Sequence, residues 1–323
     1  MTMRASLGLL VAAAVMAAAP AHAQDYPSRT IRMIVPFAAG GPADMLARAV
    51  APAMSATLKQ SIVIENKTGA GGVVGVDTVA KAAPDGYTIG ITGLGAVAAA
   101  PFMTNVPYNV QRDLAPVGRI GRVDGVIVAN AGLGLKSLAD LITYAKANPG
   151  KVNFASAGSG TSIHLAGELL NLEAGIKLIH VPYRGATPAI NDLIGGHVQV
   201  MLPDLSGVLA HIRSGALTAL AVTAQARSSA IPDVPTTTEA GYPRMLSESW
   251  YGLIAPAGTS PAALKRVHEA AMAALKSPEV MKQIETQGAT PAPNTPDEFR
   301  KLIEDEQTKW KRVIEATGVK MEQ

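Results

Sequence analysis

The sequence predicts an α/β protein of about two domains, on three observations. Short runs rich in β-branched residues alternate with longer amphipathic stretches along most of the chain, as in proteins that pack helices on sheets. The 323 residues are 48% hydrophobic and 16% charged, which is enough to build a core and too apolar for a disordered chain. The 31 Gly and 22 Pro residues exceed the average usage of about 12% and indicate many turns.

The first part of the chain repeats strand and helix. Runs of β-branched residues predict strands at 30–36, 61–65 and 87–92, with one or two more between 114 and 130. Apolar residues at helical spacing predict helices at 42–59 and about 73–83. Pro42 suits a first helical turn, whereas Pro52 lies inside the same helix and is expected to kink it.

The second part continues the alternation and ends in charged helices. The pattern predicts strands at 152–155, 178–181, 198–202, 217–223 and 252–255. It predicts helices at 137–148, 162–174, 188–195 and 206–214, of which the first is closed by Pro149 and Gly150. Three long charged helices are expected at 261–276, 278–287 and 296–317.

The N-terminus has the form of a secretory signal peptide. Residues 1–4 supply a short basic start through Arg4, residues 7–19 are apolar, and Pro20 precedes the small-x-small pattern Ala21-His22-Ala23. The apolar run is too short for a transmembrane helix, so we expect cleavage after Ala23 rather than an uncleaved anchor. With 0 Cys there is no lipoprotein anchor, disulfide or cysteine nucleophile, and a bacterial periplasm is the expected location.

Charge and motifs argue against nucleic acid and nucleotides as partners. The net charge of +3 is too small for a nucleic-acid-binding surface. The glycine cluster at 69–75 imitates a dinucleotide fingerprint, but Gly90 and Ile91 stand where an acidic residue should follow about twenty residues later. We therefore expect no cofactor.

Two small, Gly-containing loops lie between a strand and a helix. In open α/β sheets, ligands bind at the carboxyl ends of strands, where helix N-termini point inward and their N–H groups hold anions. The first loop contributes Phe37, Ala38, Ala39, Gly40, Gly41 and Asp44 as candidate ligand-binding residues. The second contributes Ser159, Gly160, Thr161, Ser162 and His164.

Two further strand ends complete the candidate site. One carries the small residues Thr92, Gly93, Leu94 and Gly95, which offer few polar side chains. The other carries Asp204, whose carboxyl group either caps the following helix or binds a ligand; a lone Asp at such a position more often caps.

A hydrolase is the alternative that these polar residues raise, with Ser162, His164 and Asp204 as its triad. However, the sequence has no G-x-S-x-G elbow, which argues against a serine hydrolase of that type. His164 lies four residues before Glu168 without a second His, so no metal site is expected.

Several motifs in register resemble the Bug (TctC-like) family of periplasmic solute receptors for tripartite tricarboxylate transporters. The similarity covers essentially the whole mature chain. Its marks are residues 26–27, 31–44, 63–72, 83–88, 158–168, 181–185, 231–242 and 255–259.

The resemblance implies two α/β domains, each a sheet flanked by helices, with two inter-domain crossovers. Residues 24–122 and 248–323 would form one domain and residues 123–247 the other. A small carboxylate would bind between them, gripped by the two Gly-containing loops and flanked by residues 92–96 and Asp204. The protein would be a monomeric receptor rather than an enzyme, and would deliver its ligand to integral membrane permease subunits. A sensor that reports to a signalling partner is the remaining alternative.

One departure from the family pattern bears on the ligand. Residues 93–100 are almost entirely Gly, Ala, Leu and Val where such receptors commonly carry polar residues. Fewer donors should disfavour small polar dicarboxylates and admit an apolar or aromatic body.

Overall fold

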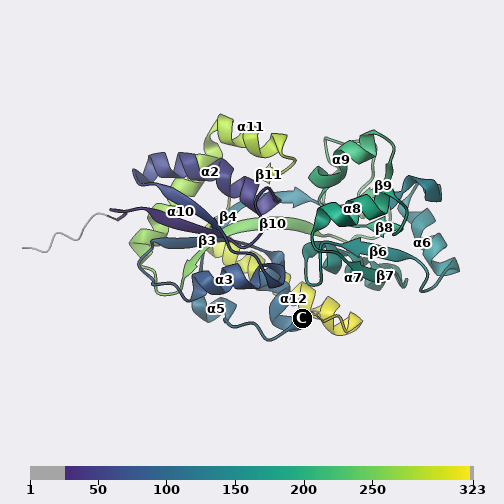
Figure 1. Cartoon of the computed structure of the whole chain (residues 1–323), viewed down its shortest axis with the longest axis horizontal. Coiled ribbons are helices and arrows are strands. Elements are labelled where there is room, and N and C mark those ends of the chain that lie inside the picture. The colour runs from purple at the N-terminus through teal and green to yellow at the C-terminus, as the bar shows by residue number, and fades with distance from the viewer. Residues whose placement is uncertain (1–25, 321–323) are drawn as a thin grey trace, which may run out of the picture.

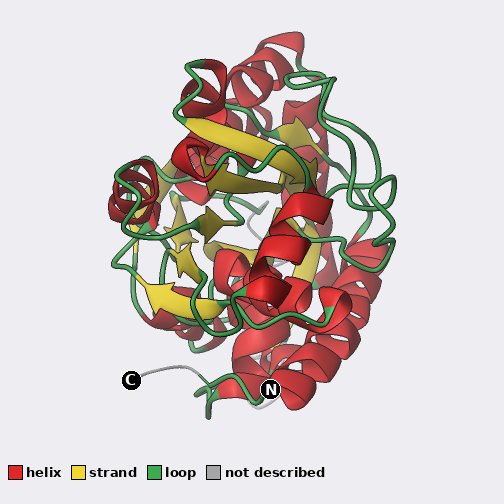
Figure 2. Cartoon of the chain, turned by 90° about the vertical axis from the view of Figure 1, so that its right-hand side faces the viewer, coloured by secondary structure: helices red, strands yellow, loops and turns green. Residues whose placement is uncertain are grey.

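The computed structural model describes residues 26–320 as two mixed sheets with helices packed around them (Figure 1). We call each sheet with its helices a lobe. The first sheet has the order β11-β4-β10-β3-β1-β2 and the second β7-β6-β8-β5-β9. Seen from the side of the second lobe, helices lie outside the strands (Figure 2). The predicted signal peptide, residues 1–23, lies outside the described residues.

The first lobe is built from both ends of the described chain. Its strands are β1 (Ile31–Val35), β2 (Ile62–Asn66), β3 (Thr88–Gly93), β4 (Leu114–Asp124), β10 (Glu248–Pro256) and β11 (Thr290–Pro291). Its helices are α2 (Pro42–Leu58), α3 (Val73–Ala80), α4 (Ala100–Met103), α5 (Val110–Asp113), α10 (Pro261–Lys276), α11 (Pro278–Thr286) and α12 (Pro296–Thr317), with the short turns η1 (Ala70–Gly72) and η2 (Gly95–Ala99). Strand β1 runs parallel to β2 and β3, whereas β10 is antiparallel to β3 and β4.

The second lobe is formed by the middle of the chain. Its strands are β5 (Val126–Asn130), β6 (Asn153–Ser156), β7 (Ile179–Pro182), β8 (Val200–Met201) and β9 (Leu217–Val222). Its helices are α6 (Leu138–Ala147), α7 (Ser162–Ala174), α8 (Ala186–Ile194) and α9 (Leu205–Arg213), with the turn η3 (Ala131–Leu133). Strand β6 is parallel to β7 and β8, and β5 is antiparallel to β8 and β9.

The chain crosses between the lobes at two adjacent places. It leaves the first sheet where β4 ends at Asp124 and enters the second at Val126, with Gly125 between them. It returns at Ser247, just before β10, and Ser247 N donates to Thr223 O while Thr223 N donates to Gly125 O, each at 2.9 Å. A Cβ on Gly125 would collide with Thr223 and Ser247. This glycine therefore lets the two crossover segments lie in contact.

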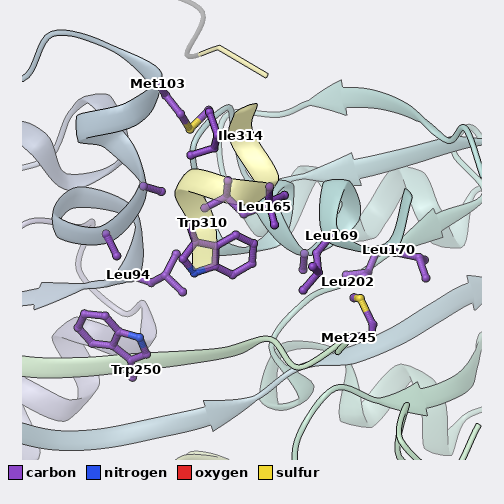
Figure 3. Packing of buried hydrophobic residues seen from close by; sticks show 14 of the residues in the cluster. Leu94, Met103, Leu165, Leu169, Leu170, Leu202, Met245, Trp250, Trp310 and Ile314 are labelled. Atoms are coloured by element: carbon purple, nitrogen blue, oxygen red, sulfur yellow. The ribbon is translucent and has the colours of Figure 1, made fainter. Parts of the chain in front are cut away.

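An apolar cluster joins the lobes beside these crossovers. Figure 3 shows Trp250 and Leu94 from the first lobe, Trp310 and Ile314 on α12, and Leu165 and Leu169 on α7 in one region. Trp250 and Trp310 are among the largest fully buried side chains. Helix α12 therefore packs against the second lobe as well as its own sheet.

Most predicted elements are present within a few residues of their expected ends, with two differences. The strand expected at 252–255 is the longer β10, because pairing with β4 extends it back to Glu248. Residues 92–96, expected as an open strand-end loop, are the end of β3 and the start of the π-helical turn η2. The residues of η2 are buried, and α12 packs against this turn, where Gln307 Nε2 donates to Val97 O at 2.7 Å.

The sequence predicts one helix at 42–59 that is kinked at Pro52. Helix α2 continues through Pro52 from Pro42 to Leu58. Within residues 26–320, none of the helices has the length and apolarity needed to span a membrane.

The anchoring of α12 yields a stability prediction. Phe299 is fully buried and lies edge-on to Trp250 at 5.6 Å between ring centroids. Its ring also packs against Gly252. Phe299→Ala should lower the free energy of unfolding by about 3–5 kcal/mol, because it removes ring contacts and leaves a cavity. Phe102→Ala is the control, since Phe102 is 36% exposed. Equal losses for the two variants in urea denaturation would contradict this role.

Candidate functional site

A cavity of about 540 Å³ lies between the two lobes. Residues of both lobes and of the crossover strand β10 line it: Phe37, Ala38, Ala39, Gly40, Gly41, Pro42, Ala43, Gly71, Leu94, Gly95, Ala157, Thr161, Ser162, Ile163, Arg184, Gly185, Ala186, Thr187, Pro188, Asp204, Ser249, Trp250 and Tyr251. The lining is mostly small and apolar, and Arg184 and Asp204 are its charged side chains.

Four helices begin at this cavity. The residues that precede the first turns of α2, α7, α8 and α9 are Gly41, Thr161, Gly185 and Asp204, and all four line the cavity. The first N–H groups of a helix have no partner within the helix and carry a partial positive charge. Their convergence makes the cavity suitable for an anion held by main-chain groups.

Asp44 does not line the cavity, but it supports the first loop from the side away from the cavity. Gly40 N and Arg48 Nε donate to its Oδ2 at 2.9 and 2.8 Å, and Asn66 Nδ2 donates to its Oδ1 at 2.9 Å. Burial alone would raise the pKa of Asp44, but these hydrogen bonds outweigh it and lower the pKa. The ionised carboxylate fixes Gly40, whose φ of +81° suits glycine.

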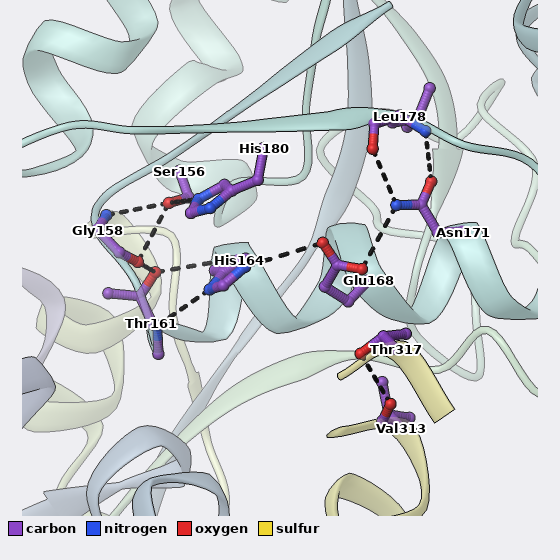
Figure 4. A network of polar contacts seen from close by, with 11 residues as sticks. Ser156, Gly158, Thr161, His164, Glu168, Asn171, Leu178, His180, Val313 and Thr317 are labelled. Atoms are coloured by element: carbon purple, nitrogen blue, oxygen red, sulfur yellow. Dashed lines mark hydrogen bonds and ion pairs between the residues drawn. The ribbon is translucent and has the colours of Figure 1, made fainter. Parts of the chain in front are cut away.

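Two stacked imidazoles support the second loop (Figure 4). Gly160 N donates to His164 Nδ1 at 3.1 Å, and Ser156 Oγ lies 2.6 Å from His180 Nε2. The two rings stack at 3.6 Å between centroids. Burial and the neighbouring ring lower the pKa of His164 to about 3, and burial lowers that of His180 to about 4. Both imidazoles are therefore neutral near pH 7, and His164 is a structural support behind the cavity.

The loop that these imidazoles hold ends in the cap of α7. Thr161 Oγ1 accepts from His164 N at 3.4 Å and donates to Gly158 O at 2.7 Å. Ser159 and Gly160 belong to this loop, but Thr161 and Ser162 are the ones that line the cavity. Thr92 and Gly93 are likewise buried in β3, whereas Leu94 and Gly95 reach the lining.

The triad of the alternative hydrolase hypothesis, Ser162, His164 and Asp204, is not assembled. Ser162 Oγ lies 3.0 Å from Ser249 Oγ, and Ser249 Oγ donates to Asp204 Oδ1 at 2.7 Å. His164 instead accepts from Gly160 N, and its Nε2 lies 3.8 Å from Glu168 Oε1. Ser162 and Asp204 thus share one network through Ser249, whereas His164 belongs to another, so the hydrogen bond between nucleophile and base that a catalytic triad needs is not formed.

Asp204 does not cap α9, contrary to the more common role of such a residue. It occupies the position before the helix, yet its side chain makes no capping hydrogen bond. Its carboxyl group accepts from Ser249 of the crossover strand instead. Burial raises the pKa of Asp204 to about 6, and the nearby Asp124 adds to the rise while the Ser249 hydrogen bond opposes it.

Besides the single residues Pro42, Ala43, Gly71, Ala157 and Ile163, sequence reasoning missed two groups of lining residues. Arg184, Gly185, Ala186, Thr187 and Pro188 follow β7, and the strand–Gly–helix pattern around Gly185 was a usable signal for them. Ser249, Trp250 and Tyr251 lie inside β10, and Tyr251 packs edge-on to Phe37. No strand-end pattern marks the latter three, because only the crossover places them beside the cavity.

The described residues offer no cluster of three or more His, Cys, Asp or Glu side chains that would hold a metal ion.

Comparisons with known proteins agree with this geometry. BugT of Bordetella pertussis is 42% identical over 319 residues, covering 98% of each chain. Among solved structures, R. palustris Rpa4515 with adipate has a TM-score of 0.83 at 31% identity, covering 92% of this chain and 100% of its own. MatC (Rpa3494) from Rhodopseudomonas palustris with bound malate has a TM-score of 0.81 at 33% identity, covering 90% and 100%.

The profile of the tripartite tricarboxylate transporter family receptor, TctC, matches residues 46–319. Together with the two-lobed fold, this match and the similarity to BugT show that the chain belongs to the Bug (TctC) family of solute receptors for tripartite tricarboxylate transporters.

Proposed function

We propose that this chain captures a small carboxylate in the cavity between its lobes and delivers it to the membrane permease subunits of a tripartite transporter. The convergence of four helix N-termini on the cavity is the observation that carries this proposal. The adipate of Rpa4515 and the malate of MatC, both dicarboxylates, support a ligand of this class.

The predicted site residues take two roles in this proposal. Those that line the cavity contact the ligand: Phe37, Ala38, Ala39, Gly40, Gly41, Leu94, Gly95, Thr161, Ser162 and Asp204. The others hold the lining in place from behind: Asp44, Thr92, Gly93, Ser159, Gly160 and His164. Arg184, which is exposed and makes no ion pair within the described residues, adds positive charge to the lining.

The lining favours a carboxylate with a sizeable apolar part. Phe37, Tyr251 and Leu94 offer ring and aliphatic surface, and the two rings meet edge-on at 6.4 Å. Main-chain N–H groups hold the acid end, whereas few side chains are available to satisfy polar groups on the rest of the ligand.

The two domains enclose the ligand in this proposal. Residues 24–122 and 248–323 form one domain and 123–247 the other, and the chain bends at the two crossovers. The chain works as a periplasmic monomer after cleavage at Ala23, and transports its ligand rather than converting it or signalling its presence. The separation of Ser162 from His164 supports a binding role without hydrolysis.

Mass spectrometry of the small molecules that co-purify with the protein, followed by calorimetry with the acids found, tests the proposal. A carboxylate that binds in one-to-one ratio without turnover is expected. Stabilisation by small polar diacids alone would contradict the apolar body, and hydrolysis of ester substrates that Ser162→Ala abolishes would contradict the receptor role.

The second loop gives a prediction with a matched control. Gly160 has a φ of +78°, so Gly160→Val should strain the loop and weaken carboxylate binding by about tenfold or more. Gly215 has nearly the same φ, +77°, but lies beyond the end of α9 with nothing near its Cβ position. Gly215→Val should destabilise the fold similarly and keep the affinity. Calorimetry of both variants checks this, and equal losses of affinity would contradict the assignment of the loop.

Asp204 gives a prediction of pH dependence. Its raised pKa of about 6 means that ionisation destabilises the folded state. The neutral carboxyl's contribution to stability is full below about pH 4 and is lost as the pH rises through about 6. Because neutralisation also removes a negative charge from the cavity, carboxylate affinity should rise by up to about tenfold between pH 7.5 and pH 5.

Asp204→Asn should remove this dependence and bind at pH 7.5 about as tightly as the unaltered protein does at pH 5. Calorimetry at the two pH values, with a ligand that stays ionised throughout, measures the effect. Affinity that falls on acidification would show instead that the Asp204 carboxylate accepts a hydrogen bond from the ligand.

A further inference from the structure

A second, larger cavity of about 860 Å³ lies beside the crossovers. We call it the crossover groove. It is lined by Arg119, Arg122, Thr223, Ala224, Gln225, Ala226, Arg244, Leu246, Ser247, Glu248, Leu302, Glu306, Lys309 and Arg312. Strand β10 serves both cavities, because Glu248 lines this groove and the next three residues line the ligand cavity.

The lining of the crossover groove is strongly basic. Four arginines and one lysine face two glutamates, Glu248 and Glu306. By contrast, the ligand cavity carries one cation and one carboxyl group. The basic side chains are thus concentrated away from the proposed carboxylate site.

Four carboxylates pair with these five cations. Lys309 pairs with Glu306 at 3.3 Å and Arg122 with Asp124 at 2.9 Å, while Glu248 and Glu173 are each shared by two arginines. Glu248 pairs with Arg122 at 2.9 Å and with Arg119 at 3.5 Å. Glu173, whose side chain is only 4% exposed, pairs with Arg244 at 2.7 Å and Arg312 at 2.8 Å. A guanidinium has five N–H donors in a planar fork that matches a carboxylate. Two guanidinium groups on one carboxylate therefore retain donors for a further anion.

The exposure of the cationic side chains distinguishes between a flat membrane surface and an extended peptide as the partner. The side chains of Arg119 and Lys309 are only 22% and 25% exposed. A flat anionic membrane would meet the exposed Arg244 and Arg312 and miss these recessed groups. An extended acidic segment could enter the groove and pair with both kinds, and arginine-rich surfaces are common at protein interfaces.

The walls of the groove come from different lobes. Helix α12 supplies Lys309 and Arg312 on one side, and residues 223–226 with Arg244 form the other. Glu173 of α7 connects the two walls, because Arg244 of one wall and Arg312 of the other both pair with it.

We propose that the crossover groove binds an acidic peptide segment of the membrane partner. This inference rests on the proposed receptor function.

Fluorescence anisotropy of a labelled hexaglutamate peptide with the full mature chain at low salt tests this proposal. The double variant Lys309→Gln/Arg312→Gln should weaken binding by about five- to twentyfold. The control is Lys265→Gln/Arg266→Gln, which removes the same charges from exposed positions on α10 and should leave peptide affinity within about twofold. Lys309→Gln alone serves as a milder second variant, since it leaves Arg312 on Glu173.

Several outcomes would overturn the proposal: no peptide binding, equal weakening by the control, competition by inorganic phosphate as effective as by peptide, or tighter binding to phosphatidylglycerol vesicles than to hexaglutamate. Carboxylate calorimetry on the same variants keeps the two proposals apart. Loss of peptide binding with intact carboxylate binding concerns the groove alone, whereas absence of carboxylate binding in the unaltered chain concerns the receptor function.

Discussion

The antiparallel pairing of β4 with β10 is the constraint on which the rest of the molecule depends. Its register runs from Glu248 opposite Asp124 to Pro256 opposite Leu114, so two segments far apart in the sequence cross between the lobes side by side. This pairing places Ser249 where it reaches Asp204 and Ser162 of the second lobe. It also places Glu248 between two arginines of β4. Both cavities are thus consequences of one strand pair.

The two cavities use different electrostatics. The ligand cavity combines main-chain N–H groups with small side chains, which allow the backbone to approach a bound anion. A Cβ on Gly95 would lie 3.1 Å from Gly160 O of the opposite lobe, so the absence of side chains also lets the lobes meet. The crossover groove relies on long cationic side chains instead, which reach a partner without a close approach of the backbone. The first arrangement suits a small enclosed ligand and the second a larger one that stays partly outside.

Local signals in the sequence were sufficient for most elements and for part of the site. Thr295 and Glu298 form the capping box that begins α12 at Pro296, where the sequence predicts it, and Gly40 and Gly41 do line the cavity. Burial and strand pairing could not be predicted from local sequence, because they depend on contacts with distant parts of the chain. Residues 92–96 look like a strand-end loop in the sequence, but they are the end of β3 and the start of η2, the turn on which α12 from the far end of the chain packs. Asp204 looks like a helix cap until Ser249, 45 residues away, takes its carboxyl group.

The stacked pair His164 and His180 has a consequence for how the cavity responds to acid. Because burial keeps both imidazoles neutral down to about pH 4, the loop that they support does not change charge between pH 5 and 8. Asp204 is then the cavity-lining group whose pKa, about 6, falls within that range. The titration of Asp204 can therefore report on ligand binding without an added label. For a ligand of constant charge, the shift in the Asp204 titration on binding measures how close the ligand's charge lies to that carboxyl group, and so its orientation in the cavity.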